Sequence, residues 1–140
     1  MRHLLLDADV VLDVLIEREP HVAFASALWA AGERGECRLS ISAHAVTTIY
    51  YLAARQRDAR RARELVGELL SVFAVAPVNQ SILLRASGLE MEDFEDAVAA
   101  AAAESAGCEA VVTRNLSDFE ASPVPAIDPA TALAWLELGE

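Results

Sequence analysis

The sequence contains no lysine, and all eleven of its basic residues are arginines. Mechanisms that need a lysine, as a catalytic amine or to hold a phosphoryl group, are therefore excluded. Acidic residues outnumber basic ones by 22 to 11, which gives a formal charge of −11 and an isoelectric point near 4.6. This excess of negative charge argues against a protein that binds nucleic acid over its whole surface, so any contact with nucleic acid must be local.

Cysteines and long apolar runs are also scarce. Cys37 and Cys108 are the only cysteines and form no CxxC motif, so neither a zinc site nor a disulfide framework is indicated. No apolar run is long enough to span a membrane, and the first residues are too few for the apolar region of a secretory signal. We expect a soluble, cytoplasmic protein with one domain over residues 1–140.

Short apolar segments alternate with segments of helical periodicity along the whole chain. We expect strands at 3–7, 37–42, 73–78, 109–113 and 124–127. The helices are expected at 9–18, at 21–34, at 43–56, after Asp58, after Asn79 or Ser81, from Asp93 to Gly107, and after Asp128. Such alternation predicts an α/β fold in which helices flank both faces of a mostly parallel central sheet of four to five strands.

The periodicity also predicts which helical side chains are buried. Phe24 and Trp29 are expected on the apolar face of the helix at 21–34. Leu70 is expected on the inner face of the helix that follows Asp58.

Carboxylates stand where apolar strands or helices begin or end. Asp7 closes the first strand, and Asp96 follows three residues after the expected N-cap Asp93. Asp118 lies in the loop that leaves the strand at 109–113. Right-handed crossovers gather the carboxyl ends of parallel strands at one edge, so we expect the acids that follow the strands to converge there. Clustered carboxylates repel one another unless a cation neutralises them, and all-oxygen sites favour Mg²⁺ or Mn²⁺.

The three segments that carry these acids resemble PIN domains, including VapC-type toxins. They are residues 4–13 around Asp7, residues 93–97 around Asp96, and residues 113–119 around Asp118. The resemblance spans nearly the whole chain and implies a metal-dependent endonuclease of single-stranded RNA. It implies that Asp7, Asp96 and Asp118 bind Mg²⁺ or Mn²⁺ and carry catalysis, with Thr113 and Asn115 orienting water or carboxylates. It further implies a homodimer and, for a toxin, a small antitoxin that blocks the acidic pocket.

One part of the family pattern is missing. PIN domains usually carry a glutamate on the helix after the second strand, and Thr48 stands at that position here. A hydroxyl supplies no negative charge, so we expect weaker metal binding than in a four-acid site. Glu92, Asp93 or Glu95 can compensate for the loss. Asp9 stands where the family more often has asparagine, and either adds a charge beside Asp7 or caps the following helix.

RNA contact requires positive charge at the rim of an acidic pocket. Arg114, beside the expected site, is the first candidate for RNA binding. The second is the arginine cluster, which consists of Arg55, Arg57, Arg60, Arg61 and Arg63. His44 suggests a general base, although a lone histidine near a helix start more often caps the helix or lies on the surface.

Two other functions compete with the nuclease. The pattern around Asp7 and Asp9 also resembles haloacid-dehalogenase-type phosphatases, but those enzymes use a lysine to hold the phosphoryl group and this chain has none. A PIN-like module that binds RNA or protein with weakened catalysis is the other alternative, and Thr48 is the feature that favours it.

Overall fold

The computed structural model describes residues 1–138 and contains one five-stranded sheet in the order β3-β2-β1-β4-β5. All of its strand pairs are parallel, as expected. The strands are β1 (His3–Leu6), β2 (Arg38–Ser42), β3 (Ala74–Ala76), β4 (Ala110–Val112) and β5 (Ala126–Ile127). The sequence prediction of four to five strands is therefore confirmed, and each observed strand is shorter than predicted.

The strand order reverses next to β1. From β1 the chain moves outward to β2 and β3, and it then returns to place β4 on the other side of β1. The crevice at the carboxyl ends of β1 and β4 is thus the topological switch point, where open α/β sheets bind their ligands. Asp7 follows β1 directly and Thr113 follows β4, so both lie at this point.

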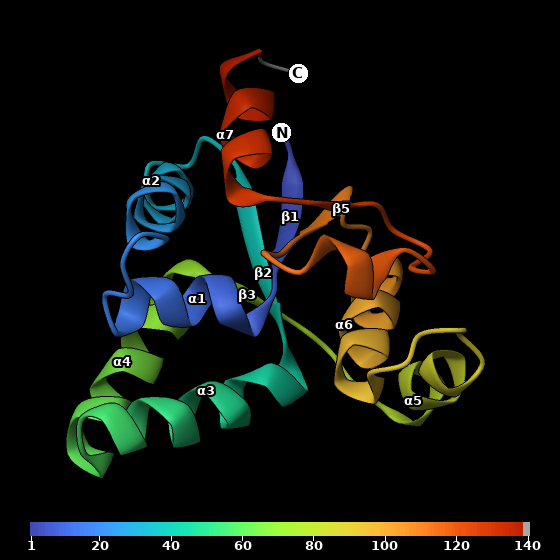
Figure 1. Ribbon diagram of the computed structural model, residues 1–140, viewed down its shortest axis with the longest axis horizontal. Helices are drawn as coiled ribbons and strands as arrows, with labels where there is room; N and C mark the ends of the chain where they lie inside the picture. The colour runs from blue at the N-terminus through green and yellow to red at the C-terminus, as the bar shows by residue number, and fades with distance from the viewer. Residues whose placement is uncertain (139–140) are drawn as a thin grey trace.

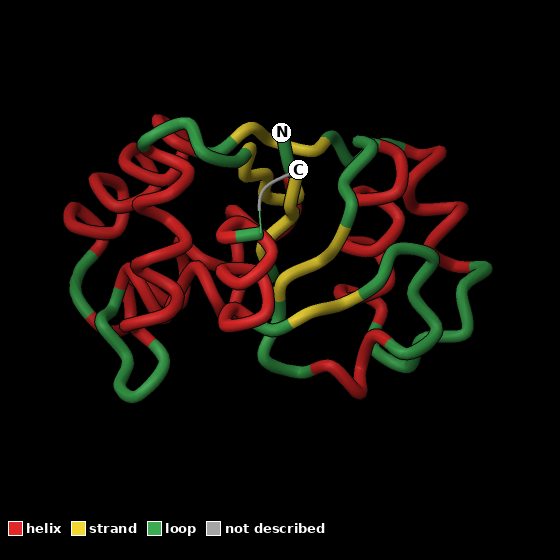
Figure 2. The backbone as a smooth tube through the Cα atoms, turned by 90° about the horizontal axis from the view of Figure 1, so that it is seen from above, coloured by secondary structure: helices red, strands yellow, loops and turns green. Residues whose placement is uncertain are grey.

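Helices cover both faces of the sheet (Figures 1 and 2). The helices α1 to α4 lie on one face and the pair α5 and α6 on the other (Figure 1). The bounds are α1 (Ala8–Leu15), α2 (Val22–Glu33), α3 (Ala43–Gln56), α4 (Ala59–Val72), α5 (Gln80–Ser87), α6 (Phe94–Ser105) and α7 (Pro129–Glu137), with a short 3₁₀ helix, η1 (Leu116–Phe119). α7 packs against α2, and its apolar residues join the same core as those of α1 to α4.

The predicted N-caps are confirmed. Asp58, Asn79, Asp93 and Asp128 each accept a hydrogen bond from a backbone amide in the first turn of the following helix. Each such cap stabilises its helix by about 1 kcal/mol. The first residues of α4, α5, α6 and α7 are therefore set by short polar side chains in the sequence.

Two apolar cores lie on the two faces of the sheet. The larger core packs the sheet against α1 to α4 and includes Leu4, Ile41 and Trp29. In the smaller core, every residue of α6 from 97 to 103 is buried, and all but Val98 are alanines. Small side chains let α6 lie close to the sheet and to α5, which fixes the position of the residues at its N-terminus.

Some expectations about individual residues were wrong. The helix expected at 9–18 ends at Leu15. Phe24 is 54% exposed and Leu70 is 46% exposed, because the buried stripes of their helices run through Ala25, Leu28 and Trp29 in α2 and through Leu65 and Leu69 in α4. Over residues 1–138, no helix combines the length and the hydropathy required to cross a membrane.

Candidate active site

Asp7 is held on both sides at the switch point. Its Oδ1 accepts a hydrogen bond of 2.9 Å from the backbone amide of Ala8, so Asp7 caps α1. Its Oδ2 accepts one of 2.9 Å from the hydroxyl of Thr113, which is fully buried. Burial, followed by the charge of Asp9, raises the pKa of Asp7 to about 6. Two hydrogen bonds therefore fix the orientation of the carboxylate, while burial and the charge of Asp9 disfavour its ionised form.

Asp96 lies in the first turn of α6. Its backbone amide donates a hydrogen bond of 3.1 Å to the carboxylate of the N-cap Asp93. The pKa of Asp96 is raised to about 7, first by burial and then by the charges of Asp7, Asp93, Asp118 and Asp9. Carboxylates from all three sequence segments therefore lie close enough to raise the pKa of Asp96.

The loop after β4 holds Asp9. Asp9 Oδ2 accepts hydrogen bonds from the backbone amide of Arg114 at 3.3 Å and from the side-chain amide of Asn115 at 3.0 Å. The backbone amide of Asn115 in turn donates to the Thr113 hydroxyl at 3.0 Å. Thr113 and Asn115 thus orient Asp7 and Asp9 respectively. Burial is the main reason that the pKa of Asp9 is raised.

Asp118 lies on η1 and is exposed. It faces a cavity of about 510 Å³ between η1 and the loop before α6. Carboxylates dominate the lining of this cavity, which includes Glu90, Glu92, Asp93, Asp118 and Glu120. Asp118 therefore stands at the open side of the cluster, while Asp7 stands at its buried side.

A buried carboxylate that the sequence analysis did not assign lies behind this site. Asp13 has no exposed surface, and its Oδ2 lies 2.8 Å from Nε of Arg114. Its Oδ1 lies 3.0 Å from Nε of Arg18 and 3.3 Å from Nη2 of Arg114. Arg114, predicted to bind RNA, is thus held by Asp13 and keeps 28% of its side chain exposed. The available signal was an aspartate four residues after Asp9 on a helix that is otherwise apolar.

Residues 3–117 match the sequence profile of the PIN domain. The chain belongs to the PIN domain family. No curated protein sequence matches it significantly. Among solved structures, a chain of Rickettsia felis VapBC2 bound to a promoter DNA fragment has a TM-score of 0.70 and 12% identity over 90% of this chain and 98% of its own. DNA-bound VapBC from Salmonella typhimurium has a TM-score of 0.68 and 21% identity, and the match covers 92% of this chain and 99% of its own. Mycobacterium tuberculosis VapC20, a toxin that cleaves the sarcin-ricin loop, has a TM-score of 0.63 and 20% identity, and the match covers 77% of this chain and 86% of its own.

Thr48 contributes no group to the innermost part of this PIN domain site. A small cavity of about 30 Å³ lies between the start of α1, the start of α3 and α6, and Asp7 and Asp96 line it. From the α3 side it is lined by Ser42, His44 and Ala45, and not by Thr48. The junction of β2 and α3 therefore presents the hydroxyl of Ser42 and the imidazole of His44 to this cavity.

The donor set fits a divalent cation by its chemistry. Oδ1 of Asp9 is buried without a hydrogen-bond partner, and the carboxyl groups of Asp7 and Asp96 have raised pKa values because they are buried among ionised neighbours. A bound cation relieves both conditions. Within residues 1–138, however, no three His, Cys, Asp or Glu side chains converge closely enough to form a ready-made metal cluster. The site is therefore an open cluster of oxygen donors.

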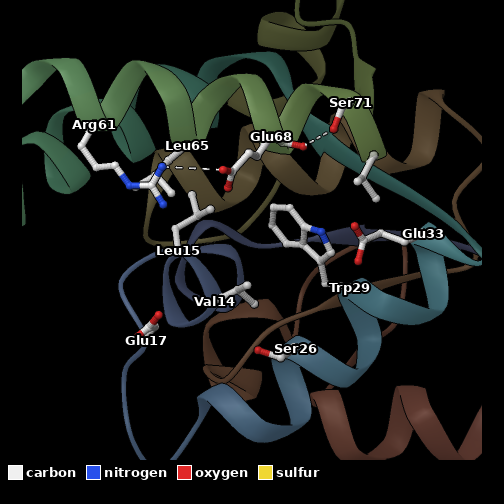
Figure 3. A pocket seen from close by; sticks show the side chains of 11 residues that line it. Val14, Leu15, Glu17, Ser26, Trp29, Glu33, Arg61, Leu65, Glu68 and Ser71 are labelled. Atoms are coloured by element: carbon white, nitrogen blue, oxygen red, sulfur yellow. Dashed lines mark hydrogen bonds and ion pairs between the residues drawn. The ribbon is translucent and has the colours of Figure 1, made fainter.

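A separate cavity of about 390 Å³ lies between α1, α2 and α4 (Figure 3). The ring of Trp29 borders it, and Arg61 lies 3.6 Å from Glu68 along the wall formed by α4. None of the acids that gather at the switch point lines this cavity. We therefore place the chemistry at the edge of the sheet and not between these helices.

Proposed function

We propose that this PIN domain is a metal-dependent endonuclease that cuts single-stranded RNA, with Asp7, Asp96 and Asp118 as its metal-binding and catalytic acids. The observation that carries the proposal is the position of Asp7 at the topological switch point, where it is hydrogen-bonded to Thr113 and lines one small cavity together with Asp96. A cluster of acids at a topological switch point, with burial and mutual repulsion raising their pKa values, is suited to binding a cation that neutralises them.

Each residue of the proposed site has a role that follows from its position. Asp7, Asp96 and Asp118 would hold Mg²⁺ or Mn²⁺, which when bound lowers the pKa of water and neutralises charge on the phosphate. Thr113 fixes the orientation of Asp7. Asn115 does the same for Asp9, whose second oxygen is left free of hydrogen bonds. Asp93 fixes the first turn of α6 and adds negative charge beside Asp96.

RNA must be held by cations outside the acidic cluster. Arg114 remains in the proposal because its backbone amide bonds Asp9, while its guanidinium pairs with Asp13 and stays partly exposed. The arginine cluster lies at the far end of α3 from the site and at the start of α4. A helix of 14 residues spans about 20 Å, so a single strand of a few nucleotides can reach from the acids to the cluster.

The proposal includes a small antitoxin as a partner, a homodimer as the assembled form, and a cytoplasmic location. The support is that structures with the same fold are described as VapBC complexes or as toxins. An antitoxin that inserts a basic side chain between Asp7 and Asp96 would match the charge of the site. Pull-down with the product of the neighbouring gene, and light scattering of the purified chain, test these two parts.

A PIN domain that binds RNA or protein with weakened catalysis is the second candidate. Thr48 favours it, because α3 supplies no carboxylate where other PIN domains have a glutamate. This candidate and the nuclease differ in one measurable respect, which is whether bound RNA is cut.

The test is cleavage of a mixed-sequence single-stranded RNA in Mn²⁺, in Mg²⁺ or in chelator. Asp96→Asn is the test variant, and Asp58→Asn is the matched control because asparagine caps a helix as well as aspartate does. Cuts that need metal, persist in Asp58→Asn and disappear in Asp96→Asn support the nuclease. RNA that is bound by folded wild-type protein but never cut would instead support the binding module.

A further inference from the structure

The cavity of about 30 Å³ beside Asp7 and Asp96 has two further polar residues in its wall, Ser42 and His44. A space of this size holds one water molecule or one metal ion. Ser42 is 1% exposed, and its hydroxyl has no hydrogen-bond partner among residues 1–138. A buried hydroxyl is rarely left without a partner, because its desolvation is then uncompensated, so this arrangement points to a bound group in the cavity.

His44 reaches across from α3 to α6. Its Nε2 lies 3.1 Å from the backbone oxygen of Glu95. Because a carbonyl oxygen can only accept, Nε2 must carry the proton, and in the neutral ring the lone pair is then on Nδ1. Nδ1 is buried and has no partner among the described residues. Metal-binding histidines are commonly fixed in this way, with the second ring nitrogen donating to a backbone carbonyl.

We propose that His44 is a ligand of the divalent cation and supplies through Nδ1 the donor that Thr48 does not. This inference rests on the proposed function, since it concerns the same cation. Asp7, Asp96 and His44 line one small cavity, and these three side chains would move closer together to hold a cation there. The Ser42 hydroxyl, which lines the same cavity, would then form a hydrogen bond with one of the groups that bind the cation.

An imidazole changes which metal the site prefers. Carboxylate and water ligands suit Mg²⁺ and Mn²⁺, whereas an added imidazole raises the affinity for Mn²⁺ and Co²⁺ more than for Mg²⁺. The substitution of the family glutamate therefore alters the choice of metal in addition to lowering the negative charge. Mn²⁺ is expected to bind this protein more tightly than Mg²⁺, and His44 is expected to account for the difference.

The test compares Mn²⁺ and Mg²⁺ binding by calorimetry in wild-type protein, His44→Gln and the matched control His21→Gln. The amide nitrogen of the introduced glutamine can still donate a hydrogen bond to the Glu95 oxygen, but glutamine has no imidazole nitrogen to bind the cation as Nδ1 would. If the role of His44 is only structural, His44→Gln keeps wild-type binding. As a metal ligand, His44 should instead be needed for Mn²⁺ affinity, which falls about tenfold or more in this variant while Mg²⁺ affinity changes much less.

Nuclear magnetic resonance of the wild-type protein gives a second readout that needs no variant to fold. The chain has only three histidines, so their ring nitrogens are readily separated in a long-range ¹⁵N–¹H spectrum. The His44 ring is expected in the Nε2–H tautomer without metal, and Mn²⁺ should broaden its signals before those of His3 and His21. An Nδ1–H tautomer, or equal Mn²⁺ affinity in wild type and His44→Gln, would overturn this inference alone. A wild-type protein that binds neither cation would overturn the proposed function as well.

Discussion

Arg114 and Asp13 are 101 residues apart in the sequence, and they form a buried ion pair with 2.8 Å between Nε and Oδ2. Asp13 also pairs with Arg18, so one carboxylate without exposed surface balances two guanidinium groups. Arg114 belongs to the loop that positions Asp7 through Thr113 and Asp9 through its own amide. The ion pair therefore joins the back of α1 to the loop that forms the site.

Asp13→Asn is expected to destabilise the protein by about 3 kcal/mol, because it leaves two arginines beside a neutral buried group. The measurement is urea unfolding at neutral pH. The matched control is Glu36→Gln, which removes the partner of Arg34 in an exposed pair with a nitrogen–oxygen distance of 2.6 Å. The control should show no measurable change. Equal effects of the two substitutions would contradict a special role for the buried pair.

Asp7 and Asp96 predict how stability depends on pH. Their folded pKa values, about 6 and about 7, lie above the ordinary value of 3.8, so between pH 4 and 7 the folded state binds more protons than the unfolded state. The free energy of unfolding therefore falls as pH rises through this range. Below pH 4 both carboxyl groups are protonated in the folded state, and they then reduce its stability least. Asp96→Asn removes one of them and should flatten the decline.

Urea midpoints between pH 4 and 8 provide the measurement for the pH prediction. Glu33→Gln on the exposed end of α2 is the control, since it removes one negative charge outside the cluster. It should keep the wild-type profile. Parallel profiles for wild type and Asp96→Asn would show that the repulsion around Asp96 is too weak to affect folding.

The alanines of α6 predict an effect of packing on the site. Ala100 is fully buried in the core between α6 and the sheet, so Ala100→Leu should destabilise the protein by about 1–3 kcal/mol through overpacking. It should also weaken Mn²⁺ binding, because α6 carries Asp96. Thermal unfolding and calorimetry measure the two effects. Ala23→Leu on the exposed face of α2 should change neither, and a similar loss there would point to a general effect of added bulk.

The strands and helix starts were predictable because their causes are local. Fully apolar runs at residues 4–6 and 110–112 form the neighbouring strands β1 and β4, and short polar residues such as Asp93 cap helices. Burial of single residues was less predictable. Phe24 is exposed because α2 is apolar on most of its surface, so its sequence does not reveal which side faces the core.

For the proposed site, the sequence could suggest Asp7 and Asp118 because parallel strands end at one edge, and Asp96 because it lies three residues after the N-cap of α6. The contacts that hold the site were not predictable. Asp13 with Arg114, and His44 with the Glu95 carbonyl, join residues 101 and 51 positions apart, and both contacts depend on the geometry of loops and helix ends. A periodic pattern within one helix carries no information about such partners.

The arginine cluster makes a prediction about salt dependence. Arg55, Arg57 and Arg60 are exposed and have no ion-pair partner among residues 1–138, whereas Arg61 lies within 4 Å of Glu64 and Glu68. If each of the three unpaired arginines contacts one phosphate, changing all three to glutamine should reduce the slope of log affinity against log salt by about 2. Fluorescence anisotropy of a labelled single-stranded RNA at several salt concentrations measures this slope.

The matched control changes the same number of arginines elsewhere. Arg2, Arg34 and Arg85 each pair with a glutamate, so changing these three to glutamine alters the net charge equally without removing unpaired cations. The control should keep most of the wild-type slope, because a paired guanidinium releases few counterions from RNA. Equal losses in both triple variants would mean that net charge alone governs binding. In that case the end of α3 would have no special part in holding RNA.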